Sequence, residues 1–122
     1  MRINPVARFM FWSIMALGLL VLSSTVHAFK YGKRHVMSIS LCLSKEEAVA
    51  MLELDKKEGT EAANKAFDAS PTCDNLAIEF IPKRTVATVQ TTRGLARVVE
   101  FQSGDKVGYW MTLQKPEGLS ET

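Results

Sequence analysis

Two cysteines, Cys42 and Cys73, are the residues of this 122-residue chain that point most directly to a defined chemistry. In a small exported domain two cysteines most often form a disulfide, and their wide spacing excludes a CxxC redox pair. With His35, the single histidine after residue 28, they supply three zinc ligands where four are needed. We therefore predict a Cys42–Cys73 disulfide, with two free thiols as the alternative, and neither a metal nor another cofactor.

A pair of acids, Glu79 and Glu100, is the next candidate, since glycoside hydrolysis needs two carboxylates across a cleft. Both lie in predicted strands, where Arg84 or Arg97 between them would relieve their mutual repulsion. Acids on the solvated face of a sheet are the commoner meaning of such a pair. His35 is a possible base, although at the start of a strand we expect a solvated surface side chain. No residue is therefore assigned a catalytic role.

Trp110 is a candidate for a binding surface, together with a group of basic residues. If Met111 faces the core, Trp110 points outward, and an exposed tryptophan among polar side chains can mark a binding site. The alternative, which we favour, is that a helix or the N-terminal segment covers this face. The basic residues can meet an acidic partner or lipid headgroups, or form an ordinary solvated face; they are Lys83, Arg84, Arg93 and Arg97.

The segment between the two cysteines is predicted to form two helices. Ser44 and Glu47 form a Ser-x-x-Glu capping box at the start of the first helix. Gly59 suits the left-handed residue that ends a helix, and Thr60 can cap the second helix. Phe67 is the large apolar side chain of the second helix, so we expect it to anchor that helix to the core.

Strands are predicted on both sides of the helical segment. Asp74-Asn75 indicates a turn, Pro82 is expected to end a strand, and a polar turn at 103–106 joins the clearest hairpin. The flanking residues 29–34 and 116–122 are expected to be a mobile lead-in and a disordered tail. The expected strands are residues 35–43, 76–81, 84–92, 95–102 and 107–114.

These elements predict one α+β domain at residues 29–115. The helices follow one strand and precede the others, which is typical of helices segregated to one face of an antiparallel sheet. We therefore expect a disulfide-clamped helical segment packed on a small curled antiparallel sheet of four to five strands.

The N-terminus carries the features of a secretory signal peptide. Arg2 and Arg8 precede the apolar run 9–22, and small residues lead to a peptidase site after Ala28. The alternative is a membrane anchor formed by residues 9–26, but the apolar run is shorter than the about 20 residues that a span needs. We therefore predict a periplasmic protein whose contact with the membrane is limited to the signal peptide 1–28.

The charge of the exported part gives no support for nucleic-acid binding. Loss of Arg2 and Arg8 removes two of the 15 basic residues, which leaves them equal in number to the 13 acids. A nucleic-acid-binding domain normally has a basic excess or a basic stripe. We therefore expect no nucleic acid among the partners.

The order of motifs resembles that of short exported two-cysteine proteins of Gram-negative bacteria that have no assigned function. The resemblance is carried by Cys42, SKEEAVAMLE, GTEAANKAF, Cys73 and a Phe80-x-Pro82 strand before a closing hairpin. It implies a disulfide-bearing periplasmic module and no particular activity.

Three functions remain open on this basis. The first is non-catalytic binding of a protein partner or an envelope component. The second is a small hydrolase or enzyme accessory that uses Glu79 and Glu100 or His35. The third is inhibition of a periplasmic hydrolase through an exposed loop at 103–106 or 93–94.

Overall fold

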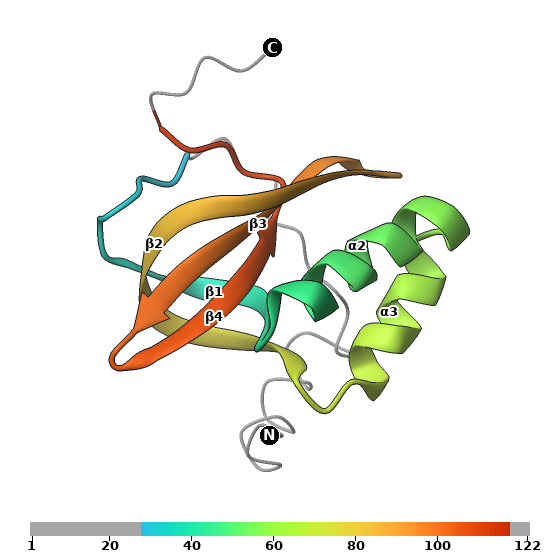
Figure 1. Ribbon diagram of the computed structural model, residues 1–122, viewed down its shortest axis with the longest axis horizontal. Coiled ribbons are helices and arrows are strands. Elements are labelled where there is room, and N and C mark those ends of the chain that lie inside the picture. Colours follow the sequence, from blue (N-terminus) through green and yellow to red (C-terminus); the bar gives the residue numbers. More distant parts are fainter. Residues whose placement is uncertain (1–27, 118–122) are drawn as a thin grey trace.

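Six regular elements follow one another in the predicted order of strand, helices and strands (Figure 1). The computed structural model describes residues 28–117. The predicted signal peptide up to residue 27 and the last five residues lie outside this described part. The elements are β1 (His35–Cys42), α2 (Lys45–Glu58), α3 (Thr60–Ala69), β2 (Cys73–Thr91), β3 (Gly94–Ser103) and β4 (Lys106–Thr112).

The four strands form a closed antiparallel barrel in the order β1-β2-β3-β4. Strand β2 has 19 residues, pairs with β1 over its first half and with β3 over its second half, and so curves around the barrel (Figure 1). Pairing of β1 with β4 at 40–42 and 109–111 closes the ring. The predicted α+β class with a curled antiparallel sheet is confirmed, with four strands.

Strand β2 corrects two predictions about where strands end. Asp74 and Asn75, expected to form a turn, pair with β1, and Pro82, expected to end a strand, pairs with Phe101 on β3. The register shifts between Pro82 and Arg84. A proline lacks the N–H that a ladder needs, and strands tolerate it at bulges, where the ladder is already interrupted. The irregularity therefore lets two expected strands become one.

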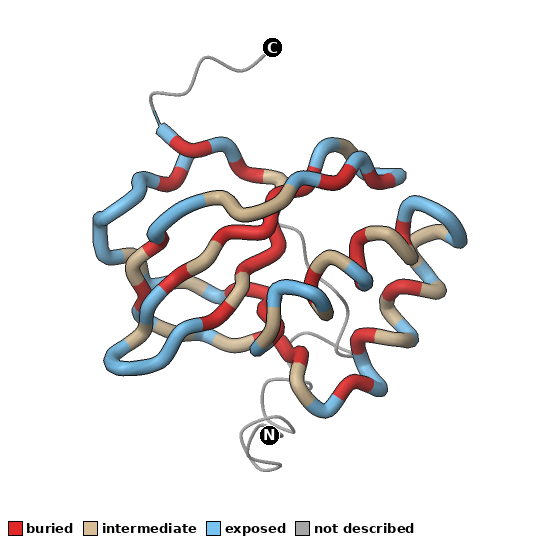
Figure 2. Tube along the Cα trace, in the orientation of Figure 1, coloured by how far each residue is buried: buried red, intermediate tan, exposed pale blue. Residues whose placement is uncertain are grey.

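Two apolar cores lie on the two faces of the barrel wall. Figure 2 shows buried residues at intervals along the strands and the helices. The first core fills the barrel interior and contains Phe29, Ile39, Leu41, Phe80, Val99, Phe101 and Trp110. The second lies between the barrel and the helices and includes Met51, Leu52, Phe67, Val89, Val98 and Met111. Successive residues of β4 thus point into different cores, because side chains alternate across a strand.

The helical layer begins and turns where local signals place it. The backbone N–H of Glu47 donates to Ser44 Oγ at 3.2 Å, which confirms Ser44 as the N-cap of α2. The Glu47 carboxylate, which was expected to complete the capping box, instead accepts hydrogen bonds from Ser70 Oγ and Thr72 Oγ1 and so ties the start of α2 to the end of α3. Gly59 has φ of +95°, as expected for the residue that ends α2.

Two predictions about α3 concern Thr60 and Phe67. Gly59, rather than Thr60, occupies the N-cap position of α3, and the Thr60 hydroxyl donates instead to Asp55 Oδ2 at 3.2 Å. Phe67 is 1% exposed and lies in the core between barrel and helices, so the predicted anchor is confirmed.

The two ends of the described chain lie together at one end of the barrel (Figure 1). Phe29 was expected in a mobile lead-in, but its ring is buried 5.0 Å from that of Trp110. Pro116, expected to begin a disordered tail, is buried and bridges to Phe29. Burial of the Phe29 ring, together with backbone hydrogen bonds that join Phe29 to Lys115 and Glu117, therefore holds the two segments against each other.

Candidate functional site

Cys42 and Cys73 form the predicted disulfide. They lie opposite each other where β1 ends and β2 begins, with Cα atoms 4.0 Å apart. Both are buried in the core beneath the helices. The disulfide thus closes the base of the loop that contains α2 and α3, as expected of a structural bridge.

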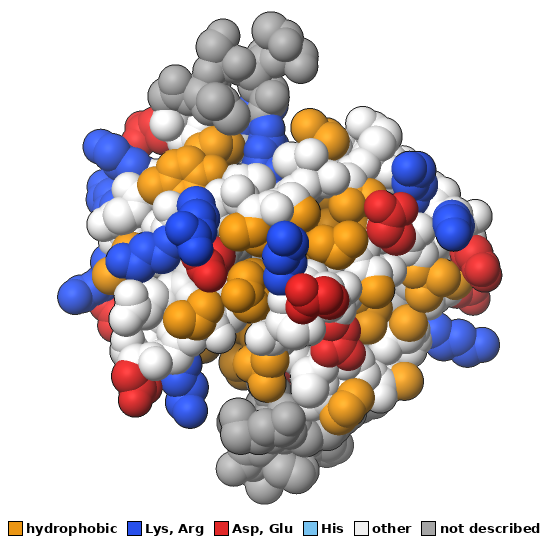
Figure 3. Space-filling view, in the orientation of Figure 1, with side chains coloured by type: hydrophobic (Ala, Val, Ile, Leu, Met, Phe, Trp, Pro, Cys, Tyr) orange, Lys and Arg blue, Asp and Glu red, His pale blue; other side chains and the backbone are white. Residues whose placement is uncertain are grey.

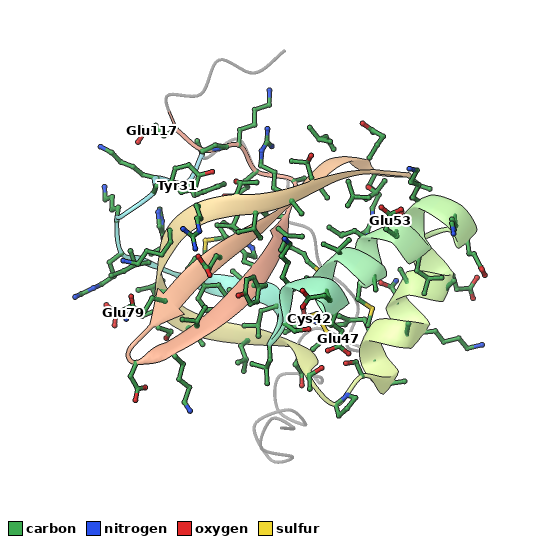
Figure 4. All side chains as sticks on the ribbon, in the orientation of Figure 1. Tyr31, Cys42, Glu47, Glu53, Glu79 and Glu117 are labelled. Atoms are coloured by element: carbon green, nitrogen blue, oxygen red, sulfur yellow. A yellow bond between two sulfur atoms is a disulfide. The ribbon has the colours of Figure 1, made fainter. Side chains whose placement is uncertain are left out.

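The two candidate acids lie in separate ion pairs. Glu79 is 3.0 Å from Arg34 on the surface, while Glu100 is 2.8 Å from Arg84 and accepts a bond from the Tyr109 hydroxyl. Burial, and then the Glu100 carboxylate, raises the pKa of Tyr109, so the phenol stays protonated and donates. Figure 4 shows Glu79 beside the barrel, on the side away from the helices.

A hollow of about 370 Å³ includes Glu79 and Arg34 but not Glu100. This hollow therefore does not contain both carboxylates. His35 is half-buried, and its Nε2 accepts a bond from the Lys30 backbone N–H at 3.2 Å. This bond occupies the nitrogen that a general base would need.

Trp110 does not lie on an exposed surface. Its side chain is 1% exposed and packs inside the barrel, with ring centroids 5.0 Å from Phe29 and 5.2 Å from Phe80. Met111 faces the core under the helices, as expected, but the opposite side of β4 is a second core. The N-terminal segment covers Trp110, which agrees with the alternative favoured from the sequence.

The basic residues do not form one cluster. Arg84 pairs with Glu100 on the barrel wall, and Arg93 pairs with Asp55 at 3.0 Å beside α2. Arg97 is buried, 4% exposed, and donates to the backbone carbonyl of Gln114 at 3.3 Å. These three arginines therefore contact separate parts of the fold, and a role of the basic residues in binding stays a prediction.

Asp55 is a buried charged residue that the sequence analysis did not identify. It lies on α2 with no exposed surface and accepts bonds from the Thr92 N–H and hydroxyl, from Arg93 and from Thr60. Burial raises the pKa of Asp55, but these hydrogen bonds and the Arg93 charge outweigh burial and lower it. Asp55 therefore stays ionised and ties α2 to the turn between β2 and β3.

An apolar groove of about 230 Å³ opens near the tip of the β3–β4 hairpin. Hydrophobic side chains gather between this hairpin and the start of α2 (Figure 3). The lining comes from β1, β2, β3, β4 and the loop before α2, so only the closed barrel assembles it. Its apolar residues are Leu41, Leu43, Leu76, Ile78, Phe101 and Val107.

The rim of the groove combines exposed apolar side chains with one cation. Leu43 is 42% exposed and Val107 51% exposed, so both present apolar surface to water. Lys106 also lines the groove and forms no ion pair with any of the residues 28–117. Gly108 has no side chain, which leaves room for the ring of Phe101 against β4.

The groove was not predicted from the sequence. Leu43 and Val107 each appeared as ordinary members of alternating strands, and nothing in the local pattern indicates that they meet. Their exposed fractions of about half follow from the chain leaving β1 immediately after Cys42.

The described part of the chain has neither a cluster of metal-ligating side chains nor a membrane-spanning helix. Among residues 28–117, no three His, Cys, Asp or Glu side chains lie together as metal ligands would. Within the same range no helix has the length and apolar character needed to cross a membrane. Comparison of the chain with protein-family models, curated proteins and solved structures found no match.

Proposed function

We propose that this chain is a non-catalytic binding module of the periplasm and that it binds a partner protein through the apolar groove near the hairpin. The observation that carries the proposal is the groove itself, with Leu43 and Val107 about half exposed at its rim. Exposed apolar surface in a concavity favours binding, because a partner removes that surface from water.

The arrangement of the acids favours binding over hydrolysis. Glu79 and Glu100 each pair with a different arginine, and the groove contains neither of them. A glycosidase-like pair needs both carboxylates on one substrate, about 5–10 Å apart. The groove lining instead supplies apolar contact and one cation.

Export to the periplasm is part of the same proposal. The disulfide between Cys42 and Cys73 suits an oxidising compartment. Ala28 is exposed while Phe29 is buried, so cleavage after Ala28 would leave the fold intact. N-terminal sequencing of the purified protein is expected to begin at Phe29, and a first residue within 1–27 would contradict cleavage at this site.

Site-specific photo-cross-linking tests the binding surface. The full chain is expressed in a Gram-negative host with a photoreactive phenylalanine analogue at position 107, and intact cells are irradiated. We expect a defined cross-linked species from position 107 that Leu43→Lys in the same chain abolishes.

Val36 provides the matched control, because it is an exposed valine of β1 outside the groove, 75% exposed. The same analogue at position 36 is expected to give no such species. Equal products from positions 36 and 107, or none from either, would contradict the groove as a binding site.

A further inference from the structure

The first three residues of β4, beside the groove, have no partner strand within residues 28–117 on the side away from β3. Strand β4 pairs with β3 along its whole length, but with β1 only at Tyr109, Trp110 and Met111. Only β3 therefore pairs with Lys106, Val107 and Gly108. Main-chain groups alternate in direction along an antiparallel strand, so at least one of these three residues directs its N–H and C=O away from β3.

The unpaired edge follows from the turn that the chain makes after the disulfide. Cys42 is the last residue of β1, and the Leu43 N–H donates to the carbonyl of Thr72 at 3.0 Å. Ser44 then caps α2, so the chain leaves the position where β1 would have continued along β4. An open strand edge is a template for a further strand.

We infer that the partner presents an extended peptide segment that adds as a strand to the Lys106–Gly108 edge and places apolar side chains in the groove. This inference rests on the proposed function and specifies its ligand. A peptide bound in this way gains affinity from main-chain hydrogen bonds and specificity from pockets for alternate side chains. The edge and the groove share Lys106, Val107 and Gly108, so one bound strand satisfies both.

The size and charge of the groove define the peptide further. At about 230 Å³ the groove is smaller than the 300–1,000 Å³ typical of small-molecule sites, so it suits one or two apolar side chains. Lys106 at the rim has no ion-pair partner in the described chain. An acidic residue beside the apolar ones would pair with it, so the segment is apolar with one acidic group.

Peptide selection followed by calorimetry tests this inference. The protein is purified from the envelope fraction of cells that express the full chain, and random peptides displayed on phage are selected against it. We expect selected peptides to share alternating apolar residues and one acid. Val107→Lys should weaken their binding about tenfold or more, and Val36→Lys should leave it unchanged. Lys106→Ala should weaken it about two- to fivefold, as a rim ion pair does.

N-methylation of the peptide backbone distinguishes strand addition from other modes of peptide binding. A selected peptide is resynthesised in two forms, with either the odd-numbered or the even-numbered amides N-methylated. One of the two forms should lose binding, because its methyl groups replace the N–H groups that face β4. Strand addition would be overturned if both methylated forms still bind, or if Val36→Lys weakens peptide binding as much as Val107→Lys does. Either result would leave the proposed binding function itself standing. A selection that enriches no peptide would overturn strand addition as well.

Two other occupants are tested in parallel. Cross-linking from position 107 to lipid in phosphatidylethanolamine–phosphatidylglycerol vesicles would assign the groove to an acyl chain and overturn the peptide. Sedimentation that shows a dimer of the wild type but a monomer of Val107→Lys would assign the edge to a second copy and likewise overturn it. Absence of any cross-link from position 107 in cells instead contradicts the proposed function itself.

Discussion

Replacement of Asp55 by asparagine tests the polar contact that fastens the helices to the barrel. The change keeps the shape of the side chain, so it opens no cavity. Oδ1 accepts from the Thr92 N–H at 3.0 Å and from the Thr92 hydroxyl at 2.6 Å, and an amide oxygen can keep both bonds. Oδ2 faces Arg93 at 3.0 Å, and an amide nitrogen there would place two donors against each other. The substitution thus removes the ion pair with Arg93 together with the hydrogen bond that Oδ2 accepts from the Thr60 hydroxyl.

The magnitude follows from the burial of the two partners. Breaking a fully buried ion pair costs about 3–5 kcal/mol, and a hydrogen bond to a charged group contributes about 1.5–3 kcal/mol. Asp55 is fully buried, but the Arg93 side chain is 30% exposed and can regain water. We therefore expect Asp55→Asn to lower the free energy of unfolding by about 2–3 kcal/mol. For a domain of this size, that corresponds to a melting temperature lower by about 8–24 °C.

The pH dependence of the free energy of unfolding tests the same ion pair independently. Interactions in the fold lower the pKa of Asp55 below 3.8, so the unfolded chain binds this proton at a higher pH than the folded one. The stabilisation is therefore complete above about pH 4 and is lost as the pH falls through the folded-state pKa. The difference between wild type and Asp55→Asn should be constant at pH 5–7 and should narrow below pH 4.

Urea denaturation followed by circular dichroism at pH 7 and pH 3 measures both effects. Glu58→Gln is the matched control, because Glu58 is an exposed acid on the same helix. It removes one charge from α2 and should change the stability by no more than about 0.5 kcal/mol. The reasoning fails if Asp55→Asn behaves like this control, or if its deficit is as large at pH 3 as at pH 7.

Three further predictions test the core. Cys42→Ala with Cys73→Ala should lower the free energy of unfolding by about 4 kcal/mol, given the separation of 31 residues, and should abolish the response of melting to reductant. Phe67→Ala should lower it by about 3–5 kcal/mol in urea, and a loss below about 1 kcal/mol would show that the ring is not core. Gly108→Ala should lower the free energy of unfolding by about 1–3 kcal/mol, because the new Cβ would lie 2.5 Å from Phe101 Cζ. Phe101→Leu in the same chain should restore part of this loss. A melting temperature of Gly108→Ala equal to that of the wild type would refute the clash.

The sequence predicted those parts of the fold that depend on neighbouring residues. The Ser44 cap, the end of α2 at Gly59 and the hairpin turn at 103–106 are each determined within a few residues. Phe67 was identified because it is the large apolar side chain of an alanine-rich helix. The disulfide was predicted because the chain has two cysteines and the sequence indicates a small exported domain.

Strand alternation could not assign Trp110, because both faces of β4 are core. Alternation establishes that Trp110 and Met111 point in opposite directions, and in an open sheet one of these directions is solvent. A closed barrel with a helical layer has apolar packing on both sides of the strand. The buried position of Trp110 therefore depends on barrel closure, which no single strand encodes.

Asp55 and the groove depend on residues distant in the sequence. The partners of Asp55 on the β2–β3 turn lie 37 and 38 residues away, so an acid next to two lysines looked like an ordinary solvated side chain. The groove needs the loop before α2 and the hairpin to meet. The prediction that Pro82 ends a strand was wrong for a related reason, since the register shift that accommodates this proline forms only against β3.

Closure of the barrel by β1 and β4 bears on when the protein can fold. The first strand pairs with the last one through Ser40, Leu41 and Cys42, so the ring remains open until residues 109–111 are available. Such pairing between distant parts of a chain is slow, because a long loop must be ordered before the contact forms. Barrel closure therefore comes late, because a chain that is still being synthesised lacks the partner of its first strand until residues 109–111 have been added.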